Sequence, residues 1–430
     1  MSDRGKAFLE TERISLMYKY NRYLNLLRIA LTAFFLLCAS VLMPVCWSSQ
    51  IMSYAQTVSS AASGNAPVYI NSSAHTLRSI NISPINGAVR YLGRGYYQSG
   101  RLIMAYSGSG CEFSFYGNKA ALTFIGDNTS SEGPASSQAR IAVYVNGEKA
   151  ADFMMDSPEK TVDVISDAVP NAYTVKVIKL SESSKSIAAL DNISVNATDS
   201  PTATANRPLN IEFVGDSITC GFGIDDTSGT GTFSTSTEDI TKTYAYLACE
   251  ALNADCSVVA FSGYGLLPGN TVTGSGTTHA PKMVSQYYDK IGYSSGHIGI
   301  CYPQNYNWTF LRTADVVVIN LGTNDAKYIS QGYNTEEEFV EAYKELITEV
   351  FDRNPKAKII CSIGMMDQTM YPAVERAVSE VNMGPGIKNV FLLRFDPQLP
   401  EDGYATDHHP SALTHARAAE QLANKIREIL

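Results

Sequence analysis

The sequence holds 430 residues, of which 45% are hydrophobic and 17% charged, and its formal net charge is −9. The length predicts roughly two or three domains, and the composition is typical of a globular chain with buried cores, which excludes a mainly disordered protein. Because binding to phosphate backbones requires a concentrated basic surface, the acidic charge argues against a nucleic-acid partner.

An uncharged run extends from Ile29 to Trp47 and approaches the roughly 20 residues that a helix needs to cross a bilayer. Six Lys and Arg residues precede this run, and the next one after it is Arg78. This asymmetry predicts a cytoplasmic tail over residues 1–28, a transmembrane anchor over 29–47 and an extracellular remainder. The alternative is a cleaved signal peptide and a secreted protein, but the run and its leader are longer than is usual for one.

Eight cysteines are present, two of them inside the apolar run. The others lack CxxC spacing, so the sequence predicts no zinc site. An extracellular location permits disulfides, whose pairing the sequence does not determine, but buried free thiols are the favoured alternative. The six cysteines concerned are Cys111, Cys220, Cys249, Cys256, Cys301 and Cys361.

Two domains are expected after a flexible stalk rich in Ser, Ala and Gly at residues 48–67. Residues 68–198 contain short β-type runs separated by turns, and Asn146-Gly147 is a strong tight-turn signal. This pattern predicts an all-β sandwich. The expected strands are Arg101–Tyr106, Cys111–Tyr116, Ala120–Ile125, Ala139–Val145, Thr161–Ile165 and Tyr173–Leu180.

After a short linker at residues 199–208, the pattern changes to apolar strands that alternate with helices over residues 209–430. Such alternation predicts an α/β domain with a mostly parallel sheet, whose ligands bind at the carboxyl ends of the strands. The clearest helix starts with a capping box, Thr335 to Glu338. The expected strands are Leu209–Val214, Ser257–Phe261, Val316–Leu321, Lys358–Ser362 and Val390–Leu393.

The first candidate for chemistry is Ser217, in the segment FVGDSITCGFG. An apolar strand ends there, a glycine allows a tight turn, and the serine stands where the chain enters a helix. Its hydroxyl is therefore expected at the carboxyl edge of the sheet, beside N–H groups that favour negative charge. Thr219 distinguishes the segment from the GxSxG elbow of α/β-hydrolases. The alternative is a serine that only caps a helix.

Three further segments follow a strand or precede a helix: SGYG at Ser262–Gly265, GTND at Gly322–Asp325 and DHHP at Asp407–Pro410. A serine hydroxyl needs a neighbouring base, and histidine titrates in the right range. The oxyanion of an acyl transfer needs donors such as a glycine N–H and an asparagine amide. Read singly, the segments are a turn, a helix entry and a surface histidine, but their joint occurrence predicts one site.

These four segments resemble the sequence blocks of the SGNH/GDSL hydrolase superfamily. Their fuller forms GDSITCGFG, SGYG, INLGTND and DHHPS, together with a preceding β-sandwich, resemble family two of the carbohydrate esterases. Stretches such as GRGYYQSGRLIMAYSGSGCEFSFYGNKAALTF and VYVNG resemble the jelly-roll module of that family. The resemblance spans roughly Val68 to Leu430 and implies an SGNH-type three-layer domain over residues 209–430.

The resemblance implies that Ser217 is the nucleophile and His409 its base. It also implies an oxyanion hole made of the Ser217 N–H, the Gly263 N–H and the Asn324 side chain. Asp325 is expected to brace loops rather than to react.

The sequence departs from the superfamily pattern before the histidine. The orienting aspartate usually stands three residues before it, where this chain has Thr406. Asp407, two residues before, matches the DxHP form of many members, whereas a backbone carbonyl orients the histidine in others, and both remain open. His408 replaces a residue that is often tryptophan, which removes an aromatic platform for the sugar and adds a rival base.

The implied substrate is an O-acetylated polysaccharide, either acetylxylan- or acetylmannan-like or a cell-envelope glycan, cleaved through an acetyl-enzyme without metal or cofactor. One alternative is an SGNH lipase or thioesterase with an apolar acyl slot, which Leu266 and Leu267 would line. The polar and aromatic composition of Asn270–Tyr306 suits glycans better. The other alternative is a non-catalytic glycan-binding surface protein, whose expected loss of the Ser, His or Asn is not found.

Overall fold

The computed structural model of the chain describes residues 76–85, 87–273, 276–280 and 283–430. The expected cytoplasmic tail, membrane segment and stalk (residues 1–28, 29–47 and 48–67) lie outside these residues. Within the described part, no helix combines the length and the apolar character that a membrane crossing requires.

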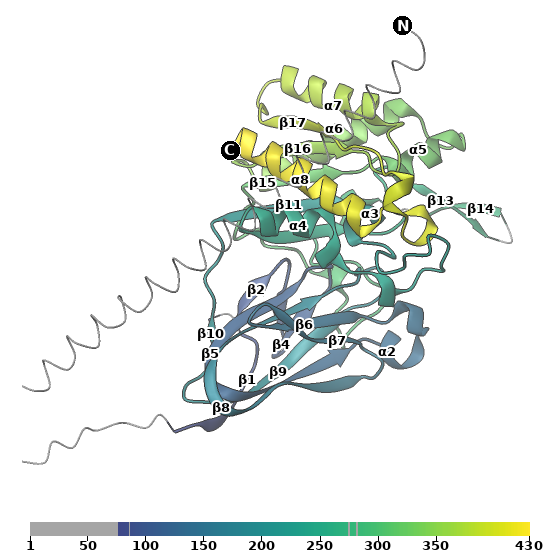
Figure 1. Cartoon of the computed structure of the whole chain (residues 1–430). Coiled ribbons are helices and arrows are strands. Elements are labelled where there is room, and N and C mark those ends of the chain that lie inside the picture. The colour runs from purple at the N-terminus through teal and green to yellow at the C-terminus, as the bar shows by residue number, and fades with distance from the viewer. Residues whose placement is uncertain (1–75, 86, 274–275, 281–282) are drawn as a thin grey trace, which may run out of the picture. The chain divides into compact units, whose positions relative to one another are not determined.

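The first half of the described chain is a β-rich domain whose strands are joined by hydrogen bonds in the order β3-β4-β9-β5-β8-β6-β7, with β1 on β9 and with β2 and β10 on β5. Figure 1 shows these strands together. They are β1 (Arg78–Ile82), β2 (Arg90–Leu92), β3 (Tyr96–Gln98), β4 (Arg101–Met104), β5 (Gly110–Gly126), β6 (Arg140–Val145), β7 (Glu148–Met154), β8 (Glu159–Lys179), β9 (Ala188–Ala197) and β10 (Thr202–Ala203).

Two pairs of expected short strands are in fact single long strands, β5 and β8, and this prediction was wrong in detail. The register of the pair shifts between Gly117 and Lys119. Before the shift the buried β5 side chains are at odd positions such as Phe113, and after it at even positions such as Leu122. An extra residue at a bulge has this effect, so both halves of β5 contribute side chains to one buried core.

Two connections of this domain bear on the sequence analysis. The turn between β6 and β7 has Asn146 at φ 52° and Gly147 at φ 90°, the left-handed pair that a tight hairpin requires, as predicted. The expected linker at residues 199–208 contains β10, in which Thr202 pairs with Ser114 of β5.

The second half is an α/β domain with a five-stranded sheet in the order β12-β11-β15-β16-β17, in which neighbouring strands are parallel. The predicted strands and the parallel sheet are therefore confirmed. The strands are β11 (Leu209–Gly215), β12 (Ala254–Ala260), β15 (Val316–Asn320), β16 (Lys358–Ile363) and β17 (Val390–Arg394), and a separate hairpin joins β13 (Gly269–Thr273) to β14 (Gly276–Ala280).

Helices cover both faces of this sheet (Figure 1). One buried cluster contains side chains of α6 and α7, and the other contains side chains of α4 and α8. The sheet is thus the middle of three layers. The α-helices of the described part are α2 (Thr129–Glu132), α3 (Ser217–Cys220), α4 (Tyr244–Ala251), α5 (Thr323–Ser330), α6 (Glu336–Arg353), α7 (Tyr371–Met383) and α8 (Ala412–Ile429).

Helix α6 follows its sequence pattern closely. The Thr335 hydroxyl accepts from the Glu338 N–H at 3.2 Å, and the Glu338 carboxylate accepts from the Thr335 N–H at 2.8 Å. This reciprocal capping satisfies two donors that the helix start would otherwise leave free. Most apolar side chains of the helix, including Phe339, Tyr343 and Leu346, are buried.

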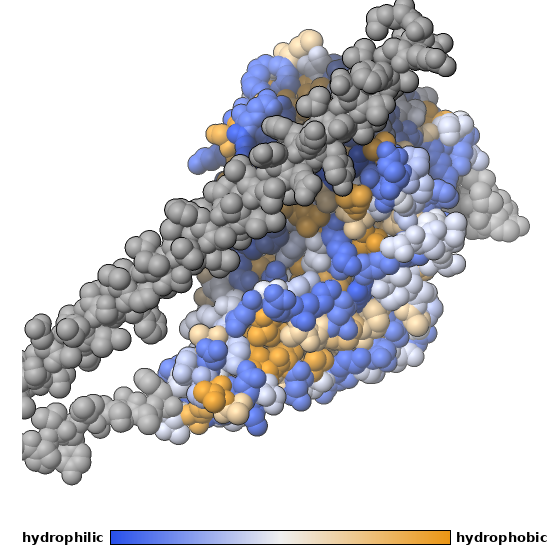
Figure 2. All heavy atoms as spheres, viewed as in Figure 1, coloured by the Kyte–Doolittle hydropathy of each residue, from blue (hydrophilic) through white to orange (hydrophobic). Residues whose placement is uncertain are grey.

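The two domains share buried contacts. Arg94 of the β-rich domain is fully buried and pairs with Glu212 of β11, with Nη2 3.0 Å from Oε2. Ile178 and Leu180 of the β-rich domain belong to the same buried cluster as Phe213 of the sheet. Figure 2 shows hydrophilic residues among hydrophobic ones on the outer surface in view. A buried ion pair and a joint apolar cluster indicate that the two domains fold against each other.

The six cysteines of the described part are free thiols, and all except Cys256 are buried. Burial raises the pKa of the Cys361 thiol because the charged thiolate loses its hydration. These residues therefore pack as small apolar side chains, which is the alternative that the sequence favoured.

Candidate active site

Ser217 is the first residue of α3, directly after β11, and its side chain is largely buried. The helix is capped by Asp216, whose carboxylate accepts from the Ile218 N–H at 3.0 Å. The alternative in which Ser217 itself is the cap is therefore wrong. The Ser217 Oγ lies 2.9 Å from His409 Nε2, a hydrogen bond across 192 positions of sequence.

The other ring nitrogen of His409 contacts the backbone of the same turn. Its Nδ1 lies 2.9 Å from the Thr406 carbonyl oxygen, so an Nδ1–H donates to that carbonyl. This bond fixes the neutral tautomer in which Nε2 accepts the proton of the Ser217 hydroxyl. Burial lowers the pKa of His409 more than its bond to Thr406 raises it, so the ring is neutral at pH 7.

The other two candidates beside His409 are placed differently. Asp407 and His408 are exposed and adopt left-handed backbone angles, φ 51° and φ 57°. Of the residues Asp407, His408 and His409, only His409 is extended, at φ −65° and ψ 162°. Among the described contacts, the Asp407 carboxylate has no hydrogen bond to the imidazole, and His408 makes none to Ser217.

Pro410 lies before the last helix and outside its first turn. Helix α8 starts at Ala412, and its cap is Ser411, whose hydroxyl accepts from the Thr414 N–H at 3.3 Å. Pro410 instead pairs with Tyr404 in an isolated bridge. The turn that carries His409 is thus closed by its own backbone, including a bond from the Ala405 N–H to the His409 carbonyl at 2.8 Å.

Two aromatic rings, which the sequence analysis did not single out, lie beside His409. The Phe222 ring stacks on the imidazole with centroids 4.3 Å apart, and Phe233 stacks on Phe222 at 4.2 Å. The Lys185 ammonium lies 5.3 Å from the centre of the Phe233 ring. Phe222 stands in the GFG of the nucleophile segment, so its closeness to the serine in sequence was the available signal.

A glycine also supports the histidine turn. Gly223 has φ +63°, and a Cβ there would lie 2.3 Å from the Thr406 Cβ, far inside normal contact. Only a residue without a side chain allows this approach. The nucleophile segment therefore packs directly on the residue whose carbonyl orients His409.

The SGYG segment forms a loop whose peptides are held at both sides. Gly263 has φ +78° with open space around it, so its backbone angle rather than crowding favours glycine. Its carbonyl accepts from the Tyr328 hydroxyl at 2.5 Å, and the next carbonyl, that of Tyr264, accepts from Asn324 Nδ2 at 2.9 Å. Asn324 Nδ2 also lies 3.3 Å from Asp216 Oδ2. The expected donors Gly263 and Asn324 are therefore brought together beside the Ser217 segment.

Asp325 braces this region as predicted. Its Oδ1 accepts from the Leu266 and Leu267 N–H groups at 2.9 and 2.8 Å. Burial raises the pKa of Asp325 to about 6 and that of Asp216 to about 7. Leu266 and Leu267 are buried in the core cluster and do not form an exposed slot.

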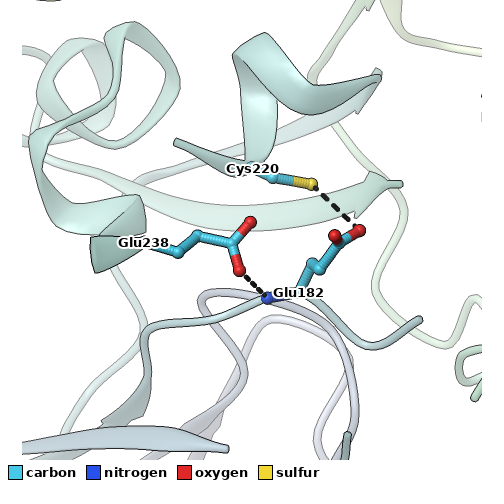
Figure 3. Close-up of side chains that lie close together, drawn as sticks. All are labelled: Glu182, Cys220 and Glu238. Carbon is cyan, nitrogen blue, oxygen red and sulfur yellow. Dashed lines mark hydrogen bonds between the residues drawn. The ribbon is translucent and has the colours of Figure 1, made fainter. Parts of the chain in front are cut away.

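Among the described residues, one group offers metal-type ligands, namely Glu182, Cys220 and Glu238, and Figure 3 shows their side chains facing one another. All three are buried, and one ligand atom of each lies within 4.8 Å of the others. They come from both domains and have no spacing motif, so the sequence analysis had no signal for them.

Fold and site together resemble those of an SGNH/GDSL hydrolase domain that follows a β-rich domain. Residues 213–417 match the GDSL-like Lipase/Acylhydrolase family, and residues 91–204 match the Carbohydrate esterase 2 N-terminal family. The chain thus combines a GDSL lipase/acylhydrolase domain with the N-terminal domain of carbohydrate esterase family two, and its relatives are family two carbohydrate esterases.

Three relatives illustrate this likeness. The chain is 30% identical over 334 residues to the cellulase/esterase CelE of Acetivibrio thermocellus. The aligned region covers 76% of this chain but only 37% of CelE. It is 23% identical to an acetylxylan esterase/glucomannan deacetylase of Cellvibrio japonicus, over 67% of this chain and 76% of that one. A family two carbohydrate esterase from Clostridium thermocellum, solved with cellohexaose, superposes with a TM-score of 0.67 at 28% identity, covering 79% of this chain and 98% of that one.

Proposed function

We propose that the protein is a serine esterase that removes O-acetyl groups from polysaccharide, with Ser217 as nucleophile and His409 as base. The observation that carries the proposal is the hydrogen bond between Ser217 Oγ and His409 Nε2, with His409 Nδ1 held by the Thr406 carbonyl. The names of the relatives, which include acetylxylan esterase and glucomannan deacetylase, support the substrate class. In this proposal residues 68–198 are the family's jelly-roll module and residues 209–430 are the catalytic domain.

The first half of the reaction forms an acetyl-enzyme. His409 Nε2 takes the proton from the Ser217 hydroxyl while its Oγ attacks the acetyl carbonyl carbon. The carbonyl π electrons move to oxygen and give a tetrahedral oxyanion, which the N–H groups of Ser217 and Gly263 and the Asn324 amide stabilise. The intermediate collapses, His409 gives its proton to the departing sugar oxygen, and the acetyl group remains on Ser217.

The second half reverses these roles with water. His409 removes a proton from the water that attacks the acetyl carbon, and the same donors stabilise the new oxyanion. His409 then returns the proton to Ser217 Oγ, so that acetate leaves and the enzyme is restored. The Thr406 carbonyl accepts from Nδ1–H throughout and stabilises the imidazolium, the work that an aspartate does in other triads. Asp407 has no part in this scheme beyond its charge.

Acetate release from acetylated polysaccharide tests the proposal. Full-length protein would be incubated with acetylxylan, acetylated glucomannan and a chemically deacetylated sample of each, and acetate would be quantified. We expect release from an acetylated polymer by the parent and none by Ser217→Ala. Chromogenic acetate and octanoate esters test chain length, and faster turnover of octanoate would contradict the assignment in favour of a lipase.

We also propose that residues 29–47 anchor the protein in the cell membrane with a cytoplasmic N-terminus and an extracellular catalytic domain. The uncharged run and the basic residues before it support this placement. The full-length protein is then expected in the membrane fraction, with protease added from outside degrading the catalytic domain of intact cells. Recovery of a soluble form that starts after Trp47 would contradict the anchor and indicate secretion.

A further inference from the structure

The loop between β8 and β9 belongs to the β-rich domain but reaches the active site. Glu182 in this loop is fully buried, and its Oε2 accepts from the Ser262 N–H at 2.8 Å. Ser262 directly precedes Gly263, whose carbonyl is held by Tyr328 at 2.5 Å. The peptide that carries the Gly263 N–H therefore lies between two anchors, one from each domain.

Glu182 is itself held from the catalytic domain. Its backbone N–H donates to Glu238 Oε2 at 2.8 Å, and Leu180 accepts from the Ile240 N–H at 3.2 Å. The Lys179 ammonium is also fully buried and donates to the carbonyls of Ser181 and Glu182. The loop is thus fixed at several points, so its carboxylate has a defined position (Figure 3).

We propose that Glu182 is a positioning residue of the active site, through which the β-rich domain holds the oxyanion-hole loop Ser262–Gly263 in its catalytic place. This inference rests on the proposed function. A donor misplaced by about an ångström loses much of its effect, because oxyanion stabilisation requires donors at hydrogen-bond distance from where the charge forms. Glu182 does not touch the substrate and acts only through Ser262.

The buried charges around Glu182 are consistent with this role. Glu182 Oε1 and Glu238 Oε1 are buried without a hydrogen-bond partner among the described residues. Two adjacent buried carboxylates repel each other, and Lys179 is the one fully buried ammonium of the described part beside them. Burial and the neighbouring Glu182 carboxylate raise the pKa of Glu238. Cys220 completes the group, with Sγ 4.0 Å from Glu182 Oε2.

The test compares four variants of the full-length protein, together with Glu238→Gln, on one chromogenic acetate ester. Glu182→Ala removes the acceptor, Glu182→Asp shortens its reach, Glu182→Gln keeps an acceptor oxygen, and the exposed Glu159→Ala of the same domain is the control. We expect Glu182→Ala and Glu182→Asp to lower kcat by about tenfold to a hundredfold with KM within about threefold. Glu182→Gln and the control are expected to stay within about threefold of the parent, since the Gln oxygen accepts from the Ser262 N–H.

Each outcome supports or overturns the inference. Parental kcat in folded Glu182→Ala or Glu182→Asp would overturn it, and where the alanine variant fails to fold, the kcat of the aspartate variant is decisive. Equal impairment of Glu182→Gln and Glu238→Gln, together with the loss of a stoichiometric metal ion measured in the parent, would overturn it in favour of a metal site. If the parent does not hydrolyse the ester at all, the proposed function is refuted. If the parent has a higher kcat than Ser217→Ala but the same kcat as Glu182→Ala, only this inference is refuted.

Discussion

The two domains contribute to the active site in different ways. The α/β domain supplies the groups proposed to react, each at a strand end or beside a helix: Ser217 after β11, the Gly263 loop after β12 and Asn324 after β15. The β-rich domain supplies no such group but buries Glu182 against the loop and Arg94 against Glu212. Chemistry is therefore concentrated in short segments of one domain, whereas support for it crosses the domain boundary.

The largest expected effect comes from removing the proposed nucleophile of the α/β domain. Ser217→Ala removes the hydroxyl that attacks the ester and leaves the capping bond from Ile218 to Asp216 intact. Turnover of an acetyl ester is expected to fall by about a millionfold, with the thermal unfolding midpoint within a few degrees. Activity within about tenfold of the parent would show that Ser217 is not the nucleophile.

The second prediction separates the two adjacent histidines. His409→Ala removes the base bonded to Ser217 and is expected to lower turnover by at least about 10⁴-fold, as the loss of a triad member does. His408→Ala, the matched control, changes an exposed side chain and is expected to stay within about threefold. Steady-state kinetics of both variants check this, and the reverse order of damage would reassign the base to His408.

The third prediction concerns the domain boundary. Arg94→Met keeps an apolar stem but leaves the Glu212 carboxylate buried without its partner, which typically costs about 3–5 kcal/mol of unfolding free energy. Arg101→Ala breaks the half-exposed pair with Asp191 and is expected to cost less than about 1 kcal/mol. Denaturant unfolding measures both, and equal losses would contradict a special role for the buried pair.

The fourth prediction concerns the buried His415 of α8 and the dependence of the unfolding free energy on pH. His415 is buried, accepts from the Tyr244 N–H at Nδ1, and has its pKa lowered by burial to about 3. Between pH 6 and 4 the unfolded chain binds a proton at this residue that the folded chain does not, so stability falls with falling pH. The contribution is on the order of 1 kcal/mol per pH unit.

The comparison for this prediction is His415→Asn, whose side-chain oxygen accepts the same N–H without titrating. Asp216 and Asp325 have raised pKa values and act in the opposite direction, because the folded chain keeps their protons. The difference in unfolding free energy between parent and variant removes these terms. We expect the parent to lose unfolding free energy relative to His415→Asn as pH falls from 6 to 4. A difference that stays constant would show that His415 takes up its proton in the folded protein as it does in the unfolded chain.

The smallest expected effect is at Asp407. Its carboxylate raises the pKa of His409 only through charge, so Asp407→Ala is expected to keep kcat/KM within about threefold at pH 7.5. Activity requires the neutral imidazole, so the acid limb of the pH profile should move to lower pH in the variant. A loss near 10⁴-fold would show instead that Asp407 orients the histidine as in standard triads.

Much of the fold and the proposed site was predictable because its signals are local in sequence. Apolar runs of β11, β15 and β16 predicted the parallel sheet, and the Thr335 capping box predicted where α6 begins. The segments that contain Ser217 and His409 stand at element boundaries, and the resemblance to the SGNH/GDSL hydrolases implied the roles of the two residues. Each of these signals depends on neighbouring residues and on backbone geometry, which the order of amino acids determines directly.

Only the tertiary structure decided which group bonds to the His409 ring and which residues contact the Ser262–Gly263 loop. The choice between Asp407 and the Thr406 carbonyl depended on left-handed angles at positions 407 and 408, which no pattern of residue types predicts. The single long strand β5 depended on where a bulge shifts its register. The contacts of Glu182, Arg94 and the Phe222 ring join residues far apart in the chain, and burial of a charge or a ring is a property of the assembled fold rather than of its local sequence.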